Sequence, residues 1–332
     1  MQWDVAGLGN ALMDALVVVD DDSLLDELGM ARGMMHPVDH AKWTEVYERV
    51  QTQGVTFDSG GSCANTIATV GRLGGQAIYC GQVGEDQMGK LYASLMERAC
   101  GAHRIRFTKA SATGKCLSII SRQDAERTML TDLGAATQLP ELGTFADEVR
   151  ASRVAHFEGY MLLPGPNRDV TLEAMRIAEA APTIVSFDAS DPFVVHQLRD
   201  LLWEELERSV DVVFLNVEEA RALAGVEDAE EAARRIAVRA RIATVAVKLG
   251  AQGSLVLADG TLHRIPADRV HAIDTTGAGD AYAGGFLFGL SQGWSAPRAA
   301  RLASSVAALA VSQLGAVVKD ADALERAITD AA

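Results

Sequence analysis

The sequence predicts an α/β protein in which a mainly parallel sheet carries helices on both faces and a second, small β-sheet lies beside it. From residue 154 onward, short apolar runs alternate with segments of helical periodicity, which is typical of buried parallel strands joined by helices. Between residues 103 and 133, extended segments follow one another without an intervening helix, as in an antiparallel sheet. The chain of 332 residues is long enough to bury a large core.

The composition limits the classes of partner. A formal net charge of -15 and a sequence pI of about 4.9 argue against nucleic acid or an anionic membrane surface as a binding partner. The first residues contain no basic region, and no stretch reaches the ~20 apolar residues that span a bilayer, so we expect a cytoplasmic protein. The four cysteines are widely spaced without a Cys-x-x-Cys pair, which predicts reduced thiols.

The first elements of the chain are expected to be strands at residues 5–9, 16–19, 32–35 and 55–58, a helix at 39–51, and a second helix that follows the glycine pair 60–61 and reaches Leu73. Gly7 and Gly9 resemble part of a dinucleotide fingerprint, but Leu12 occupies the third glycine position and no helix pattern follows, so we reject that interpretation.

A paired glycine, Gly60 and Gly61, precedes the second of these helices. Paired glycines let another molecule approach the backbone closely, and Asn65 in the first helical turn offers both a donor and an acceptor to hydroxyl groups. The same segment resembles a nucleophile elbow around Ser62, but no acid and histidine follow in the order that an esterase needs. We therefore interpret it as a ligand-binding turn.

A second glycine-containing segment, Gly84 to Lys90, follows a predicted strand at 76–83. It resembles a phosphate-binding P-loop, but Leu91 replaces the Ser or Thr that would hold magnesium, and Glu85 and Asp86 would repel phosphates. We interpret it as the start of an ordinary helix.

The extended segments at 104–107, 115–122 and 127–132 are expected to form a small antiparallel sheet with 16–19 and 32–35. Such a sheet, hinged to a larger body, is suited to be a lid over a ligand; an ordinary antiparallel extension is the alternative. We expect one unit over residues 1–332, with a large α/β part at about 1–13, 38–104 and 134–332 and a lid at about 14–37 and 105–133.

The βα repeats of the second half predict strands at 154–158, 183–188, 211–216 and 244–248, with helices near 167–180, 193–207 and 229–239. Ligands of such sheets bind at the carboxyl ends of the strands. The polar or glycine residues expected at those ends are Asp188, Asn216, Glu219, Gly250 and Asp280.

The segment Asp274 to Asp280 (Asp-Thr-Thr-Gly-Ala-Gly-Asp) is expected to follow a strand at 268–273 and to open a helix. The backbone N–H groups of Gly277, Ala278 and Gly279 would then lack intrahelical partners and, with the helix dipole, form an anion site. Asp280 would place a carboxylate beside this anion, which suits a group that accepts a proton from an attacking hydroxyl.

With these residues, the whole chain resembles the ribokinase-like (PfkB) family of sugar and nucleoside kinases, whose two signature regions match Gly60-Gly61 with Asn65 and Asp274 to Asp280. The resemblance implies a central, mainly parallel sheet with a small β lid. It also implies that Asp280 is the catalytic base and that the amides of Gly277, Ala278 and Gly279 form the anion hole.

The resemblance further implies a nucleotide and cation side, with ATP and Mg²⁺ as cofactors. Asn216 and Glu219 match an Asn-x-x-Glu motif that organises magnesium and phosphates through water, although Val217 replaces a common acidic residue. Asp274, Thr276 and the loop around Gly315 resemble the loops that bind a monovalent cation in many members of the family. The resemblance therefore implies a possible K⁺ site. The remaining residues on the ATP side are Asp188, Lys248, Gly250, Gly253 and Thr275.

The acceptor side resembles the adenosine kinase branch in Asn10, Asp14 and the lid strand around Arg127. Tyr160 lies where a ring stacks on a base, or is an ordinary core tyrosine. Asp188 stands where adenosine kinases usually carry Asn and some sugar kinases Asp. The implied activity is ATP-dependent phosphorylation of a primary hydroxyl, with adenosine first and a furanose or keto sugar second; an idle nucleotide-binding regulator is the alternative, and the chain would be a monomer or a homodimer.

Overall fold

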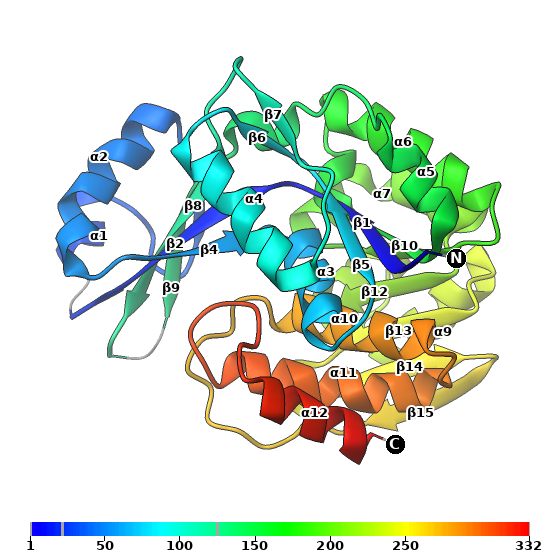
Figure 1. Cartoon of the computed structure of the whole chain (residues 1–332). Helices are drawn as coiled ribbons and strands as arrows, with labels where there is room; N and C mark the ends of the chain where they lie inside the picture. Colours follow the sequence, from blue (N-terminus) through cyan, green and yellow to red (C-terminus); the bar gives the residue numbers. More distant parts are fainter. Residues whose placement is uncertain (1, 21–22, 124–125, 332) are drawn as a thin grey trace.

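The computed structural model describes residues 2–20, 23–123 and 126–331 and contains two main sheets (Figure 1). In the described residues the larger sheet has eight strands, of which the pairs β13–β14 and β14–β15 are antiparallel and the others parallel, as the predicted mainly parallel sheet requires. Its strands, in spatial order, are β15 (Thr261–Ile265), β14 (Ser254–Ala258), β13 (Thr244–Lys248), β12 (Val212–Asn216), β11 (Ile184–Asp188), β10 (Ser152–Glu158), β1 (Trp3–Leu8) and β5 (Ala77–Cys80).

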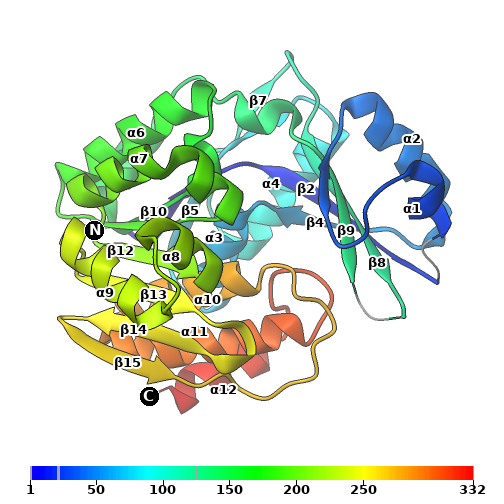
Figure 2. The same cartoon turned by 180° about the vertical axis from the view of Figure 1, so that it is seen from behind.

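Helices cover both faces of this sheet (Figures 1 and 2), which explains why its strands are almost continuously apolar. On β12, Val213 and Leu215 pack into one core cluster, whereas Val212 and Phe214 pack into the other. The first face carries α5 (Phe145–Ala151), α6 (Pro166–Glu179), α7 (Pro192–Ser209), α8 (Val217–Ala224) and α9 (Ala229–Ala240). The second carries α3 (Ser62–Arg72), α4 (Gln87–Cys100), α10 (Ala278–Ser291) and α11 (Ala296–Val311), with α12 (Ala321–Asp330) packed outside α11.

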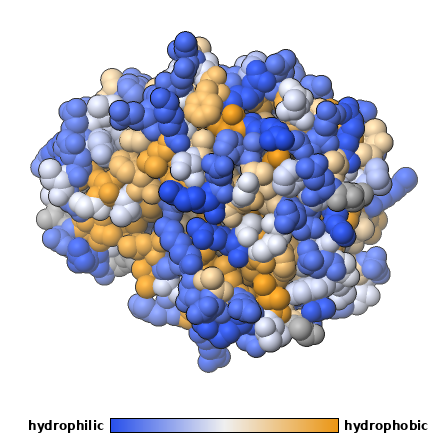
Figure 3. Space-filling model, viewed as in Figure 1, coloured by the Kyte–Doolittle hydropathy of each residue, from blue (hydrophilic) through white to orange (hydrophobic). Residues whose placement is uncertain are grey.

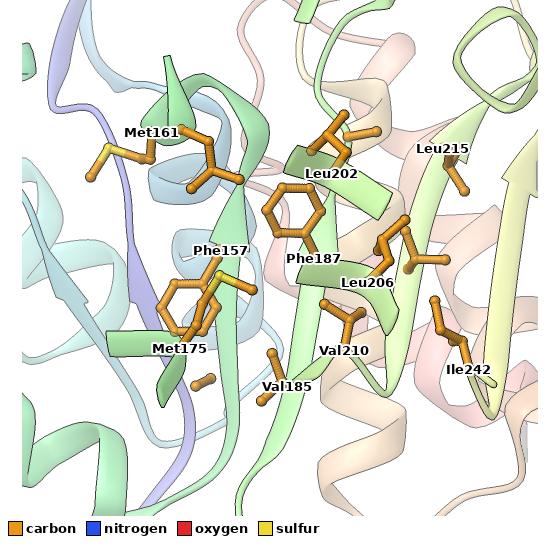
Figure 4. Packing of buried hydrophobic residues seen from close by; sticks show 14 of the residues in the cluster. Phe157, Met161, Met175, Val185, Phe187, Leu202, Leu206, Val210, Leu215 and Ile242 are labelled. Atoms are coloured by element: carbon orange, nitrogen blue, oxygen red, sulfur yellow. The ribbon is translucent and has the colours of Figure 1, made fainter. Parts of the chain in front are cut away.

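The larger core cluster fixes the positions of the central strands. Phe157 on β10 and Phe187 on β11 are about 1% exposed and project from neighbouring strands toward Met175 of α6 and Leu202 of α7 (Figure 4). Burying a side chain of this size contributes about 1.5–3 kcal/mol. The carboxyl ends of these strands are therefore held at one rigid edge.

The smaller sheet has five strands in the described residues, and its topology differs from the expected antiparallel patch: β2–β8 and β3–β9 are parallel pairs, so the sheet is mixed. One face is covered by α1 (Ser23–Leu28) and α2 (His40–Val50), whose apolar residues form a separate core with it. The strands, in spatial order, are β3 (Met35–Pro37), β9 (Arg127–Asp132), β8 (Gly114–Ser121), β2 (Leu12–Val19) and β4 (Thr56–Gly60).

Three local expectations were wrong. The strand β4, assigned to the larger part, pairs with β2 in the smaller sheet. The segment expected at 104–107 forms β7 (Arg106–Thr108), which pairs instead with β6 (Gln82–Gly84). Residues 268–273 form no strand, because after β15 the chain leaves the sheet as a loop in which Val270 and Ile273 are 46% and 41% exposed. The first two errors concern which strand lies alongside, which local pattern does not encode.

Within the part of the chain that the structure describes, no helix combines the length and apolar character needed to cross a membrane.

Candidate active site

The polar residues predicted at the strand ends do meet at one edge of the larger sheet. The parallel register aligns Glu158 with Asp188 and Asn216 with Lys248. The Lys248 ammonium donates a hydrogen bond of 2.8 Å to Asp188 Oδ2. A Cβ added to Gly279 would lie 3.1 Å from Lys248 Nζ, so this ammonium lies directly against the start of α10. A cation and a helix N-terminus thus face the same point.

The predicted turn has the expected conformation. Gly277, the N-cap of α10, has φ of 69°, and a side chain there would overlap Ala316. Ala278 N donates a long bond of 3.4 Å to Thr275 O, whereas the amides of Gly277 and Gly279 make none of the turn and loop bonds found in the described residues. Two of the three amides expected to form an anion hole therefore remain available to a ligand, and the third is weakly engaged.

Asp280 lies on the first turn of α10 and stays partly accessible to solvent. Its Oδ1 accepts a hydrogen bond of 2.8 Å from Ser62 Oγ, and its Oδ2 accepts one of 2.9 Å from Asn65 Nδ2. Desolvation raises the pKa of the Asp280 carboxyl, and these two donors oppose the rise because they stabilise the ionised form. The carboxylate is therefore oriented and reachable, as a proton acceptor must be.

Asn65 was expected to contact the acceptor, and the structure gives its amide nitrogen to Asp280 instead. Its Oδ1 is buried and has no partner among the described residues, so one atom of the side chain is left for a ligand. Asn10 also uses one side-chain atom within the protein, since its Oδ1 accepts a hydrogen bond of 2.9 Å from Asn167 Nδ2. Asn167, on the first turn of α6, was missed because nothing in its local sequence points to a partner 157 residues away.

The two glycines between β4 and α3, Gly60 at the end of the strand and Gly61 at the N-cap of the helix, are required by the residues that they touch. A side chain on Gly60 would overlap the carboxylate of Asp14, and one on Gly61, whose φ is 99°, would overlap the carbonyl of Asn10. Burial raises the pKa of Asp14 to about 7, although the guanidinium of Arg127 opposes the rise. Four of the predicted acceptor-side residues, Asn10, Asp14, Gly60 and Gly61, therefore lie together.

Glu158, at the carboxyl end of β10, is a second residue that the sequence interpretation missed. It is fully buried, and its two oxygens accept hydrogen bonds of 2.9 Å from Asn10 N and 2.6 Å from Cys63 N. Burial raises its pKa to about 7, opposed by these two backbone donors. An acidic residue at the end of a buried strand, before Gly159, was the signal that could have identified it.

Two predicted acceptor-side residues make contacts with other parts of the protein. Arg127 of β9 donates to the hydroxyl of Thr276, so the smaller sheet touches the glycine turn. Tyr160 packs against the larger core, and its hydroxyl donates 3.3 Å to Asp191 Oδ2. These contacts agree with the core alternative for Tyr160; a stacking contact stays a prediction.

On the expected ATP side, Asn216 and Glu219 form the capping box of α8. Glu219 Oε2 accepts 2.7 Å from Asn216 N, and Asn216 Oδ1 accepts 2.8 Å from Glu219 N. Burial raises the pKa of Glu219 to about 7, and the ammonium of Lys248 opposes the rise. Gly250 and Gly253 adopt φ of 59° and 90° in the neighbouring turn, and Thr275 is an exposed residue of the glycine turn.

The residues expected around a monovalent cation are also together. Asp274 is 3% exposed; its Oδ1 accepts 2.9 Å from Thr276 N and its Oδ2 accepts 3.0 Å from Gly315 N. Asp274 therefore joins the glycine turn to the loop after α11. Over residues 2–20, 23–123 and 126–331, no group of three or more His, Cys, Asp or Glu is placed to hold a metal ion.

Known proteins similar to this chain identify its family. Residues 34–322 match a family model described as pfkB family carbohydrate kinase. The chain is 28% identical to adenosine kinase of Saccharomyces cerevisiae over 83% of this chain and 84% of that protein. It is 27% identical to fructokinase-1 of Oryza sativa subsp. japonica over 69% of this chain and 72% of that one.

Two solved structures are similar over nearly the full length. Adenosine kinase from Sinorhizobium meliloti has a TM-score of 0.88 and 34% identity, with 100% of both chains covered. A probable sugar kinase from Rhizobium etli has a TM-score of 0.89 and 32% identity, with 99% of this chain and 98% of that chain covered.

Proposed function

The chain belongs to the pfkB family of carbohydrate kinases, and from this premise we propose that it transfers the γ-phosphate of ATP to a primary hydroxyl of a nucleoside, with adenosine as the first candidate. Membership makes it a phosphotransferase that acts on a hydroxyl group. Its similarity to both an adenosine kinase and a sugar kinase at more than 30% identity leaves the acceptor to be argued from the site.

The observation that favours a nucleoside is the face of the smaller sheet that α1 and α2 do not cover. Strand register places Asp14, Cys116 and Thr131 on one face, and Arg127, which contacts the glycine turn, shares it. The opposite face carries the residues covered by α1 and α2, such as Leu117. The uncovered face therefore looks toward the site.

Beyond Asp14 this face is mostly apolar. Leu16, Val18, Ile120 and Met129 all lie on it by register. In Figure 3, hydrophobic side chains also gather over the part of the molecule that carries α1, α2 and the smaller sheet. A planar base can cover such a wall while the hydroxyls of its ribose reach the carboxylate of Asp14. Leu16 and Ile120 are already 7% and 3% exposed. The apolar surface that a base could still cover therefore belongs to the half-buried Val18 and Met129, and its burial is worth roughly 25 cal/mol per Å².

In the proposed reaction, Asp280 accepts the proton of the acceptor hydroxyl as that oxygen forms a bond to the γ-phosphorus and ADP leaves. The amides of Gly277 and Gly279, with a contribution from Ala278, stabilise the charge on the transferring group. Lys248 adds a positive charge beside Gly279. Mg²⁺ bound to ATP would neutralise part of the phosphate charge. Glu219 and Asn216 would hold this ion through water molecules.

A parallel assay of ATP consumption with adenosine, other nucleosides, fructose, ribose and 2-keto-3-deoxygluconate tests the proposal. We expect kcat/KM for adenosine to exceed that for each sugar by at least about 100-fold, or about 3 kcal/mol. Turnover with a sugar alone would replace adenosine by that sugar while leaving the kinase class intact. No turnover with any acceptor would favour the nucleotide-binding regulator.

The cation requirements are proposals of the same kind. Removal of Mg²⁺ with a chelator is expected to abolish turnover, and Mg²⁺ is expected to restore it. Replacing K⁺ by a bulky organic cation tests the loop around Asp274 and Gly315, where a cation would bind the carbonyl oxygens of two loops that Asp274 already joins.

A further inference from the structure

The hydroxyl of Ser62 donates its hydrogen bond to a residue far away in the sequence rather than to its own helix. Ser62 is the first residue of α3, where a serine side chain commonly helps to satisfy its own helix terminus. Here the N-cap is Gly61, and no side chain caps the helix. Ser62 Oγ instead donates 2.8 Å to Asp280 Oδ1, on a helix that is 218 residues away in sequence.

The surrounding contacts hold this hydroxyl in place. The amide of Cys63, next to Ser62, donates 2.6 Å to the buried carboxyl of Glu158, which fixes the first turn of α3 against β10. Further along, α3 packs directly on α10, since a Cβ on Gly284 would lie 2.6 Å from Thr69 Cβ. The helix that carries Ser62 is therefore held by β10 at its first turn and by α10 along its length, which keeps the Ser62 hydroxyl in place beside Asp280.

The geometry of the pair restricts the carboxylate. Ser62 holds Oδ1 and Asn65 holds Oδ2, so rotation of the Asp280 carboxylate about its terminal bond would break both hydrogen bonds. Each oxygen retains a further acceptor position for the proton of a ligand. Of the two donors, Asn65 also has a buried Oδ1 without a partner among the described residues, whereas Ser62 Oγ has the Asp280 carboxylate as its observed partner.

We propose that Ser62 is a positioning residue for the reaction: its hydroxyl orients the Asp280 carboxylate and keeps it ionised, so that Asp280 can take the proton of the acceptor hydroxyl. This inference rests on the proposed function, in which Asp280 is the base. In the step itself, the acceptor O–H bond breaks, the new O–P bond forms as the bond to ADP breaks, and the proton passes to Asp280 while Ser62 keeps its own proton.

Several charged or titratable groups act on Asp280 together with Ser62, so the effect of the hydroxyl must be separated from theirs. Burial raises the pKa of Asp280, the donors Asn65 and Ser62 lower it, the charge of Asp188 raises it and that of Lys248 lowers it. The groups that interact with Asp280 from the surrounding elements are Asp188, Lys248, Glu158, Asp14, Cys63 and Tyr160. None of these is altered by a substitution at Ser62.

The experiment compares the pH dependence of kcat and kcat/KM for Ser62→Ala and the unaltered protein between pH 5 and 9. Because a hydrogen bond to an ionised group is lost, the acidic limb of the profile is expected to move upward by about one pH unit. Turnover should be about tenfold low on the acidic limb and should recover as the pH rises above it. The KM for ATP should stay within about twofold, since the substitution leaves the Lys248 side of the site intact.

Two matched variants isolate the hydroxyl. Ser62→Thr keeps a hydroxyl at the same position and is expected to restore the acidic limb. Thr66, on the same helix, has a hydroxyl that donates a hydrogen bond of 3.3 Å to the main-chain oxygen of Asp280 rather than to its carboxylate. Thr66→Val removes this hydroxyl and should leave the acidic limb in place. If Ser62→Ala folds poorly, Ser62→Cys, which retains a weak donor, should give a smaller shift in the same direction.

An unshifted acidic limb in Ser62→Ala would overturn the proposal, as would a defect confined to the KM of the acceptor, which would make Ser62 a substrate contact. The parallel variant Asp280→Asn separates this failure from that of the function: an inactive Asp280→Asn with an unshifted Ser62→Ala rejects only the role of Ser62. An active Asp280→Asn would reject the assignment of the base itself.

Discussion

Helices cover the two sheets of the molecule differently, and each sheet carries a different group of the proposed site residues. Helices cover both faces of the larger sheet, and the residues proposed for phosphate transfer, Asp188, Lys248 and Asp280, project from its strand ends and from α10. The smaller sheet is covered by α1 and α2 on one face only. Its other face carries Asp14 and Arg127 beside apolar residues.

In the proposed reaction, the rigid edge of the larger sheet would hold the phosphate-transfer groups and the half-covered smaller sheet would select the acceptor. Groups that stabilise developing charge must be preorganised, which a sheet buried on both faces provides. Acceptor choice needs surface that a ligand can cover, and Asp14, Val18 and Met129 of the smaller sheet are half-buried rather than buried. Substitutions in the two regions should therefore affect different kinetic constants.

The largest effect is expected on the rigid side, from Asp280→Asn. The amide cannot accept the proton of the acceptor hydroxyl, so kcat should fall by about 10³–10⁴-fold. ATP affinity should remain within about an order of magnitude, because the amides of the glycine turn are retained. Steady-state turnover and calorimetric ATP titration measure the two quantities, and near-normal turnover would contradict the assignment of the base.

The next effect tests whether the glycine turn is as constrained as its contacts indicate. Gly277→Ala adds a methyl group at φ of 69° in a place occupied by Ala316. We expect a loss of about 3 kcal/mol in unfolding free energy, from left-handed backbone strain and overpacking together. Gly260→Ala is the matched control, since Gly260 has φ of 76° but nothing within 4 Å of an added Cβ. Equal destabilisation of the two variants in denaturant titrations would show that the contact with Ala316 contributes nothing.

In the smaller sheet, Asp14→Asn should change the kinetic constants for the acceptor and leave those for ATP unchanged. Loss of the charged acceptor of hydroxyl hydrogen bonds is expected to lower kcat/KM for the nucleoside by about 30-fold, or roughly 2 kcal/mol. The KM for ATP should stay within about twofold. A similar rise in both KM values would mean that the two regions are not functionally separate.

The smallest expected effect concerns the pH dependence of stability. The pKa of Glu158 is raised from 4.5 to about 7 in the folded protein, so its contribution to stability is fully present below pH 4.5 and is lost as the pH rises through 7. Glu158→Gln should remove on the order of 2 kcal/mol from the decrease in unfolding free energy between pH 4.5 and 8.

Glu205→Gln is a control at another buried glutamate, which pairs with Arg176 far from the site. It should lower stability without flattening the profile over this pH range. If Glu158→Gln leaves the pH profile of the unaltered protein unchanged, the raised pKa of Glu158 is not the cause of the dependence.

The elements of the larger sheet could be predicted because their signal is local. The strands expected at 154–158, 183–188, 211–216 and 244–248 match β10 to β13 within about two residues, since apolar runs buried on both faces and helical periodicity are written in consecutive residues. Asp188, Asn216 and Lys248 then follow at strand ends, where parallel strands bring side chains together.

The smaller sheet was harder, because pairing between distant segments decides it. Nothing near residues 56–60 indicates that they pair with β2, or that β8 runs parallel to β2. For the same reason the partners of the site residues were missed: Ser62 with Asp280, Asn167 with Asn10, and Glu158 with the amides of Asn10 and Cys63.

The sequence alone determined the class of fold, the glycine turn and the proposed base, because each depends on residue type within a few neighbouring positions. The tertiary structure decided how the base is held, which face of the smaller sheet meets the site and which polar atoms are left for a ligand. Hydrogen bonds and packing between segments more than 90 residues apart, such as Cys63 to Glu158 and Ser62 to Asp280, form only when the whole chain has closed around them.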